Sequence, residues 1–281
     1  MKHFTTSDGI NLAYRDEGDG LPLLCLAGLT RNSTDFDYVA PHLRGVHLIR
    51  LDYRGRGASE HADHETYTVP IEARDVVELL DHLNLKRCAI LGTSRGGLIA
   101  MVLAATAKDR LTGVCLNDIG PEVAPEGLKH IMTYLGRRPP QKTYADAAAA
   151  RAEFMEGFDN VPMSRWMHEV QRHHVETEKG LGINYDPKLR RAVEIAGAQP
   201  TPDLWPLFDA FDGIPLALIR GQNSNLLAEA TAVEMRNRRP DMLFADVPGR
   251  GHVPFLDEPE SLSVLHAFIE NVRQHTTEHA D

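Results

Sequence analysis

The residues best suited to chemistry lie in Gly92-Thr93-Ser94-Arg95-Gly96, a Gly-x-Ser-x-Gly sequence between an apolar run and an Ala/Leu/Met-rich run. Strand, sharp turn and helix in that order are what a nucleophilic serine on a strained turn requires. Glycines relieve crowding at such a turn, and the first N–H groups of the helix favour a developing negative charge. Gly-rich turns match the same five-residue pattern by chance, so the flanking elements matter more than the pattern. We predict that Ser94 is a nucleophile.

A nucleophilic serine needs a base and donors for the oxyanion. His252 follows the last predicted strand, on a loop shaped by Pro248, Gly249 and Gly251. Such a loop can bring the imidazole over the sheet edge that carries Ser94, so we predict His252 as the base.

The donors are predicted to be two backbone N–H groups. Gly28 permits a turn toward the nucleophile after an earlier strand, which leaves the N–H of Leu29 as one donor, and the N–H of Arg95 is the other.

These pieces, in this order, resemble the α/β-hydrolase superfamily. The matching segments span most of the chain: Ala27-Gly28-Leu29, Asp52 to Ser59, Gly92 to Gly96, Arg220 to Asn225, and Gly251-His252. The resemblance implies an α/β fold with a mostly parallel twisted sheet, helices on both faces and a helical cap insertion. It also implies that the Asp52 segment is structural. No cofactor and no metal are expected.

The chain departs from the family pattern at two places. Ala27 stands where the family usually has histidine, which removes a bracing side chain but keeps the backbone donor. Asn225 stands where the family usually has the acid that orients the base. An amide there cannot supply negative charge, and in a serine protease the same change costs about 10⁴ in turnover.

Three explanations for Asn225 stay open. Asp118 follows the strand after the nucleophile, a place from which some family members draw their acid, although Asp-Ile-Gly-Pro is also ordinary turn chemistry. Alternatively, Asn225 is an introduced Asp-to-Asn change made to trap a substrate. Thirdly, the protein is naturally slow, or is a binder.

The surrounding pattern alternates apolar strands with helices, which predicts a mostly parallel sheet covered on both faces. Strands are expected near 3–6, 10–15, 21–26, 46–51, 87–91, 111–116, 214–219 and 242–247, and helices near 71–83, 98–107, 144–158 and 261–272. The alternation stops between about 120 and 206, where no strand pattern is visible. We therefore expect a core domain over 1–120 and 207–281 and a helical cap domain over 121–206.

The composition of the chain limits the kinds of molecule that the protein is expected to bind. The formal charge of −10 argues against nucleic acid, and the 42% apolar and 25% charged fractions are ordinary for a soluble chain. Three scattered cysteines in apolar runs indicate structural thiols, and with no apolar leader or membrane-length run, a cytoplasmic location and no membrane partner are expected. The histidines at 168, 173 and 174 lack metal-site spacing and are expected to be solvated. The expected partner is a small-molecule substrate, and a homodimer is left open.

The function expected from these residues is hydrolysis of a small carboxylic ester, lactone or related carbonyl compound through an acyl-enzyme on Ser94. Cleavage of a carbon–carbon bond in a vinylogous ketoacid and ligand binding with weakened catalysis are the alternatives. The pocket is expected to be mostly apolar, although arginines and histidines of the cap could meet an acidic substrate. Its expected walls are Gly28, Trp166, Leu226 and Val253.

Overall fold

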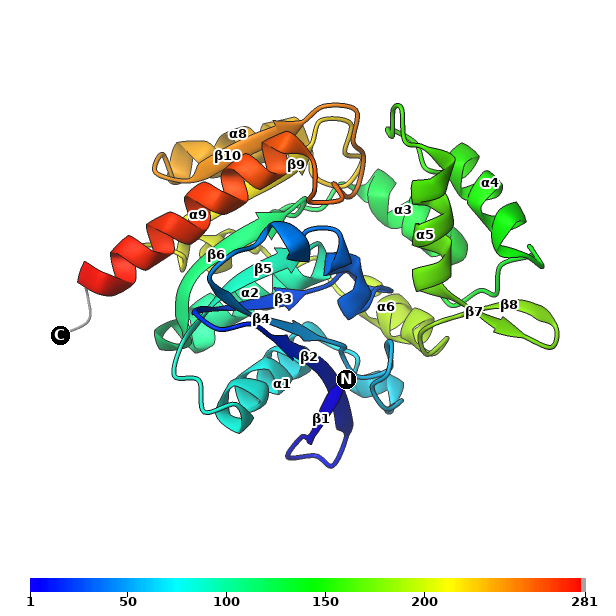
Figure 1. The fold of residues 1–281 in the computed structure, drawn as a ribbon, viewed down its shortest axis with the longest axis horizontal. Helices are drawn as coiled ribbons and strands as arrows, with labels where there is room; N and C mark the ends of the chain where they lie inside the picture. Colours follow the sequence, from blue (N-terminus) through cyan, green and yellow to red (C-terminus); the bar gives the residue numbers. More distant parts are fainter. Residues whose placement is uncertain (279–281) are drawn as a thin grey trace.

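The computed structural model describes residues 1–278 and is built on one eight-stranded sheet with the order β1-β2-β4-β3-β5-β6-β9-β10 (Figure 1). From β4 onward all neighbours are parallel, whereas β1 and β2 are antiparallel additions at one edge. The strands are β1 (Lys2–Thr5), β2 (Asn11–Glu17), β3 (Leu21–Leu26), β4 (Val46–Leu51), β5 (Cys88–Thr93), β6 (Leu111–Asn117), β9 (Leu216–Gly221) and β10 (Leu243–Val247).

Both faces of this sheet are covered, as the apolar runs predict. On one face α1 (Val69–His82), α2 (Arg95–Thr106), α7 (Trp205–Asp209) and α8 (Glu229–Arg238) share a buried apolar cluster with the strands. On the other face α9 (Pro259–Glu278) packs on β6, β9 and β10 together with the short 3₁₀ helices η1 (Ser33–Asp37) and η2 (Ala40–His42). The expected α/β fold with a mostly parallel sheet is confirmed.

The strands inside the sheet are near-continuous apolar runs because water reaches neither face. In β5 and β6 every residue is buried. Cys25, Cys88 and Cys115 lie in three of these strands as free, buried thiols, and burial raises the pKa of Cys88 to about 12. The thiols therefore fill core space and form no disulfide.

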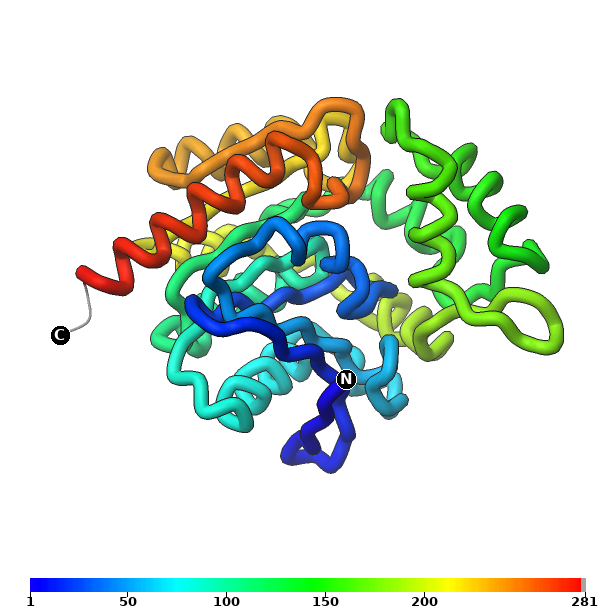
Figure 2. The backbone as a smooth tube through the Cα atoms, viewed as in Figure 1, coloured from blue at the N-terminus to red at the C-terminus, as the bar shows by residue number. Residues whose placement is uncertain are grey.

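The inserted segment (residues 121–206) holds α3 (Pro125–Tyr134), α4 (Tyr144–Phe154), α5 (Met163–His173) and α6 (Leu189–Gly197). The view of the backbone shows α3, α4 and α5 gathered at one side of the sheet (Figure 2). The expectation of a segment without strands is wrong, because β7 (His174–Thr177) and β8 (Gly180–Ile183) form an antiparallel hairpin. Its strands are four residues long and mostly not buried, so they carry no apolar run from which to predict them.

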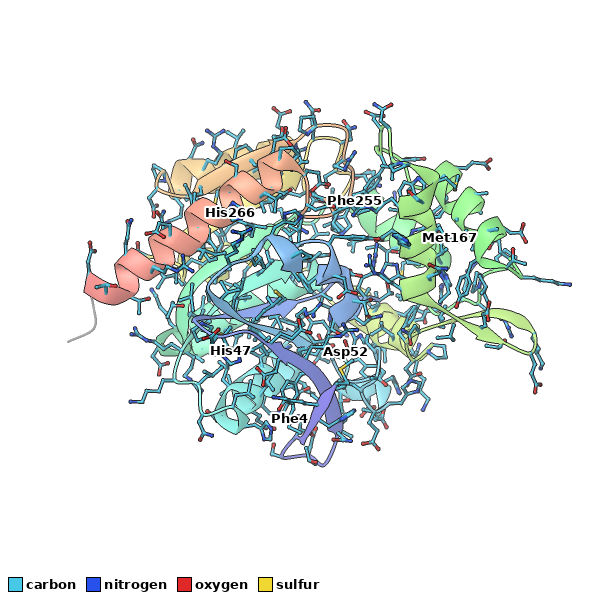
Figure 3. All side chains as sticks on the ribbon, in the orientation of Figure 1. Phe4, His47, Asp52, Met167, Phe255 and His266 are labelled. Atoms are coloured by element: carbon cyan, nitrogen blue, oxygen red, sulfur yellow. The ribbon has the colours of Figure 1, made fainter. Side chains whose placement is uncertain are left out.

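The far end of the inserted segment joins the sheet layer. Trp205, counted with the insertion from the sequence, begins α7, which packs against α2. A second link lies nearer the site, where Phe255 of the loop after β10 packs against the helix that carries Trp166 and Met167 (Figure 3). The division into a core and a cap domain stays a prediction.

Candidate active site

Ser94 lies on a tight turn between β5 and α2. Its backbone has φ 49° and ψ −111°, an unusual conformation for a residue with a side chain. The turn is possible because its glycines allow close approach: a Cβ on Gly96 would lie 2.1 Å from the Leu26 carbonyl oxygen. The strand–turn–helix context predicted for Ser94 is therefore present.

Ser94, His252 and Asp118 form a continuous hydrogen-bonded chain. His252 Nε2 lies 3.1 Å from Ser94 Oγ, and His252 Nδ1 lies 2.7 Å from Asp118 Oδ2. The three residues come from different strand ends, because β5, β6 and β10 all finish at the same edge of the parallel sheet. Asp118 is fully buried, whereas the imidazole is partly exposed.

The Asp118 carboxylate accepts two further hydrogen bonds, one from the last residue of β9 and one from the loop that follows it. Gly221 N donates to Oδ1 at 2.8 Å, and Ser224 Oγ donates to Oδ2 at 2.6 Å. Ser224 Oγ in turn accepts from the N–H groups of Leu226 and Leu227. In the sequence Ser224 is only one member of the segment from Arg220 to Asn225, and nothing there predicts its contact with Asp118.

Asn225 takes no part in that chain. Within residues 1–278 its side chain makes no hydrogen bond, and it lines the cavity beside His252. The loop that usually supplies the acid in this kind of fold thus contributes a serine that holds Asp118.

The two backbone N–H groups expected to hold an oxyanion lie near the nucleophile. Arg95 begins α2, so its N–H has no acceptor within the helix. A Cβ placed on Gly28 would lie 3.9 Å from Ser94 Cβ, so the loop carrying Leu29 passes close to the nucleophile. The Arg95 side chain points elsewhere and binds Glu72 Oε2 at 2.6 Å.

A cavity of about 720 Å³ opens over Ser94 and His252. Its floor includes Gly28, Leu29 and Val253. Of these, Gly28 and Val253 are predicted wall residues. The inserted segment supplies most of the remaining walls, with residues from α3, α4, the end of α5 and β8.

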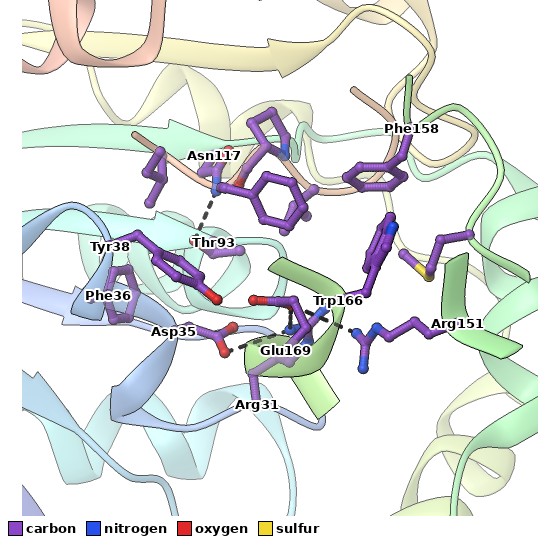
Figure 4. A pocket seen from close by; sticks show the side chains of 15 residues that line it. Arg31, Asp35, Phe36, Tyr38, Thr93, Asn117, Arg151, Phe158, Trp166 and Glu169 are labelled. Carbon is purple, nitrogen blue, oxygen red and sulfur yellow. Dashed lines mark hydrogen bonds and ion pairs between the residues drawn. The ribbon is translucent and has the colours of Figure 1, made fainter. Parts of the chain in front are cut away.

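Two predicted wall residues lie elsewhere. Leu226 is buried against Gly127 in the core cluster under the site. Trp166 is buried among Phe158 and Phe255 and lines only a neighbouring cavity of about 20 Å³ (Figure 4). Both side chains are buried because the removal of a large apolar group from water is favourable, and the wall of a water-filled cavity would leave that group exposed.

The expectation of solvated histidines is wrong for His173. This side chain is 7% exposed and lies within hydrogen-bond distance of Arg31 Nη1 (2.7 Å) and Asp35 Oδ1 (2.6 Å). Arg31 also donates to Glu169 Oε2 at 3.0 Å, which joins the loop after β3 to α5. Burial and the neighbouring Arg31 hold the pKa of His173 well below its ordinary value, so the imidazole is neutral at pH 7.

Other expectations concern metals and membranes. Within residues 1–278 no group of three or more His, Cys, Asp or Glu side chains is arranged to hold a metal ion. Among the same residues no helix is long and apolar enough to cross a bilayer.

Asp52, expected to be structural, accepts hydrogen bonds from the N–H groups of Ser33 and Ala58 and so braces two loops.

The fold and the strand-end residues define an α/β hydrolase, and the chain belongs to that family: residues 23–263 match the model of the alpha/beta hydrolase family. A 3-hydroxybutyrate-oligomer hydrolase from Cupriavidus necator is 34% identical over 271 residues, covering 92% of both chains.

A crystal structure of an alpha/beta hydrolase from Novosphingobium aromaticivorans is 38% identical and superposes with a TM-score of 0.90 over 96% of this chain and 97% of that one. The structure of E-2-(acetamidomethylene)succinate hydrolase, 22% identical with a TM-score of 0.82 over 96% and 98%, shares the fold. The family and the Cupriavidus relative are hydrolases, and this chain is an enzyme of the hydrolase kind.

Proposed function

We propose that the protein is a serine hydrolase that cleaves a small carboxylic ester through an acyl-enzyme on Ser94. The observation that carries the proposal is the chain of hydrogen bonds from Asp118 through His252 to Ser94 at the floor of the cavity. Nucleophile, base and orienting group in hydrogen-bond contact are the arrangement that activates a serine hydroxyl.

In the proposed mechanism, His252 Nε2 accepts the hydroxyl proton as Ser94 Oγ attacks the ester carbonyl. The N–H groups of Leu29 and Arg95 hold the oxyanion, and each such donor is typically worth roughly 10²–10³ in turnover. His252 then protonates the departing alcohol. A water molecule, deprotonated by the same imidazole, releases the acid and restores Ser94.

In this mechanism Asp118 holds Nδ1 of His252, so Nε2 is free to accept the proton, and it stabilises the imidazolium that forms. Asn225 is then not the acid, and its change from the family pattern needs no introduced substitution to explain it.

The substrate class is supported by the Cupriavidus relative, whose name describes hydrolysis of short oligomers of 3-hydroxybutyrate. Each bond in such an oligomer is an ester between a hydroxy acid and the next carboxyl group. A cavity of about 720 Å³ is within the range of sites for ligands of that size. We propose short hydroxyacid oligoesters as the substrates of this chain.

Labelling with a fluorophosphonate, located by mass spectrometry, tests the nucleophile. We expect the intact protein to be modified at Ser94 and Ser94→Ala to be unmodified. Ser263→Ala, the same substitution at an exposed serine of α9, is the control and should be labelled at Ser94 like the parent. An intact protein that resists the reagent, or labelling at another serine, contradicts the proposal.

Hydrolysis of a linear 3-hydroxybutyrate dimer and of p-nitrophenyl butyrate then separates the alternatives. Turnover of both, lost in Ser94→Ala, supports ester hydrolysis. A labelled protein that turns over neither ester but cleaves a vinylogous ketoacid is a carbon–carbon hydrolase. Binding of small carboxylates without turnover of any of these compounds identifies a ligand-binding protein.

A further inference from the structure

We propose that Arg151 of α4 binds a free carboxylate of the substrate, so that the enzyme prefers esters carrying an acid group at one end. The inference rests on the proposed ester hydrolysis and adds to it the end of the substrate that is recognised. Four observations support it: the unpartnered nitrogen of Arg151, the charge of the cavity wall, the space around the guanidinium and its connection to the nucleophile.

Arg151 lacks a close carboxylate partner. Its Nε is buried without a hydrogen bond, the nearest carboxylate oxygen is Glu169 Oε2 at 3.9 Å, and its Nη1 has only the neutral His173 at 3.3 Å. The adjacent Arg31 takes the same Glu169 oxygen at 3.0 Å. Arg31 is therefore the direct partner of Glu169, and the guanidinium of Arg151 makes no close ion pair.

The pKa directions of the two arginines agree with this difference. Burial opposes the charge of Arg31, but Asp35 and Glu169 outweigh it and raise its pKa. Burial and the neighbouring Arg31 lower the pKa of Arg151, and Glu169, Tyr134 and Asp35 offset this only in part. A bound carboxylate would give Arg151 the direct ion pair that no side chain supplies at close range.

The net charge of the cavity wall is opposite in sign to the net charge of the chain. The protein carries 40 acidic and 30 basic residues. The cavity is nevertheless lined by four arginines and two glutamates, namely Arg31, Arg137, Arg138, Arg151, Glu153 and Glu156. Charge of this sign in a cleft attracts anions and raises their local concentration.

A water molecule can accept a hydrogen bond from a nitrogen of Arg151, but it carries no charge to balance that of the guanidinium. The small cavity drawn in Figure 4 is lined by Arg151, Tyr38 and Asn117, and Tyr38 Oη and Asn117 Oδ1 also lack hydrogen-bond partners. Its volume of about 20 Å³ has room for about one water. Arg151 also lines the large cavity, where a carboxylate has room.

The connection to the nucleophile runs through Arg31. A Cβ on Gly28 would lie 3.3 Å from Arg31 Cγ and 3.9 Å from Ser94 Cβ, so Arg31 begins beside the nucleophile. Its guanidinium and that of Arg151 both reach the ring of His173. One wall of the cavity therefore leads from Ser94 to Arg151.

Binding without turnover tests the proposal. In the Ser94→Ala background, calorimetry measures Kd for the linear 3-hydroxybutyrate dimer and for the same dimer with its terminal carboxyl converted to a primary amide. We expect tighter binding of the acid, and we expect Arg151→Gln to weaken its binding about 10- to 100-fold while leaving the amide nearly unchanged. Arg151→Lys, which keeps the charge, should restore part of the loss.

Arg172→Gln is the matched control, because Arg172 on α5 also has a buried nitrogen without a partner but does not line the large cavity. It should leave both Kd values unchanged. Equal binding of acid and amide, no binding of the acid, or equal losses for both ligands in Arg151→Gln overturns the proposal. Because the readout is binding, these outcomes are distinct from failure of the Ser94 labelling, which overturns the proposed function.

Discussion

At the scale of single residues, two side chains lie at strand ends from which they could reach His252. Asp118 and Asn225 follow β6 and β9, which are neighbours in the sheet, so both reach the same edge. The side chain that meets His252 Nδ1 is Asp118, whose Oδ2 lies 2.7 Å away. The sequence could place the two candidates but not choose between them, because loop conformation decides which one turns inward.

Substitution of the two candidates should give opposite results. We expect Asp118→Asn to lower kcat about 10⁴-fold, because an amide cannot stabilise the imidazolium and favours the wrong tautomer. Asn225→Asp should leave kcat within a few-fold of the parent, since Asn225 makes no hydrogen bond with His252. The measurement is kcat on p-nitrophenyl butyrate, with circular dichroism to verify folding. A rise of several orders of magnitude in Asn225→Asp would instead identify Asn225 as a lost acid.

At the scale of elements, the strands and the turn at Ser94 were predictable because apolar runs and glycine spacing are local signals. The β7–β8 hairpin was not, because its strands pair with each other at the surface and bury little. Trp166 shows the same limit in the inserted segment. A tryptophan can line a pocket or fill a small core, and only its packing against Phe158 and Phe255 reveals the second.

The close packing of α2 on β3 leads to a prediction for Gly96. A Cβ there would lie 2.1 Å from the Leu26 carbonyl oxygen, which belongs to rigid backbone. We expect Gly96→Ala to destabilise the fold by about 1–3 kcal/mol and to displace the nucleophile, lowering kcat. Urea unfolding and ester hydrolysis measure the two effects. Gly197→Ala, where a Cβ meets nothing within 4 Å, is the control, and equal behaviour of the two variants would refute the packing argument.

At the scale of the whole molecule, the inserted segment is tied to the sheet domain by charge as well as by apolar contact. Glu169 of α5 binds Arg31 of the loop after β3, and Arg165 of α5 binds Asp257 of the loop after β10 at 2.5 Å. The sequence gives no signal for these pairs, since their members are more than ninety residues apart. These ion pairs help to hold the inserted segment, which lines the cavity, against the loops at the strand ends.

Loss of the Glu169 charge should weaken the whole fold. Glu169→Gln leaves Arg31 and Arg151 buried with fewer counter-charges, and breaking a buried pair in this way typically costs about 3–5 kcal/mol. The free energy of unfolding in urea is the measurement. Glu234→Gln is the control. It removes an exposed charge paired with Arg238 and should leave the midpoint of urea unfolding unchanged. Similar midpoints for both variants would show that the Glu169 link does not stabilise the fold.

The three thiols, finally, give the folded chain a practical property. Cys25, Cys88 and Cys115 are all buried in strands, and burial raises the pKa of each, so a maleimide reagent meets no reactive thiolate while the fold is intact. A cysteine introduced at exposed Met163 on α5 would therefore be labelled alone. A dye attached there would report whether the surroundings of α5 change during turnover, without any native cysteine first being removed.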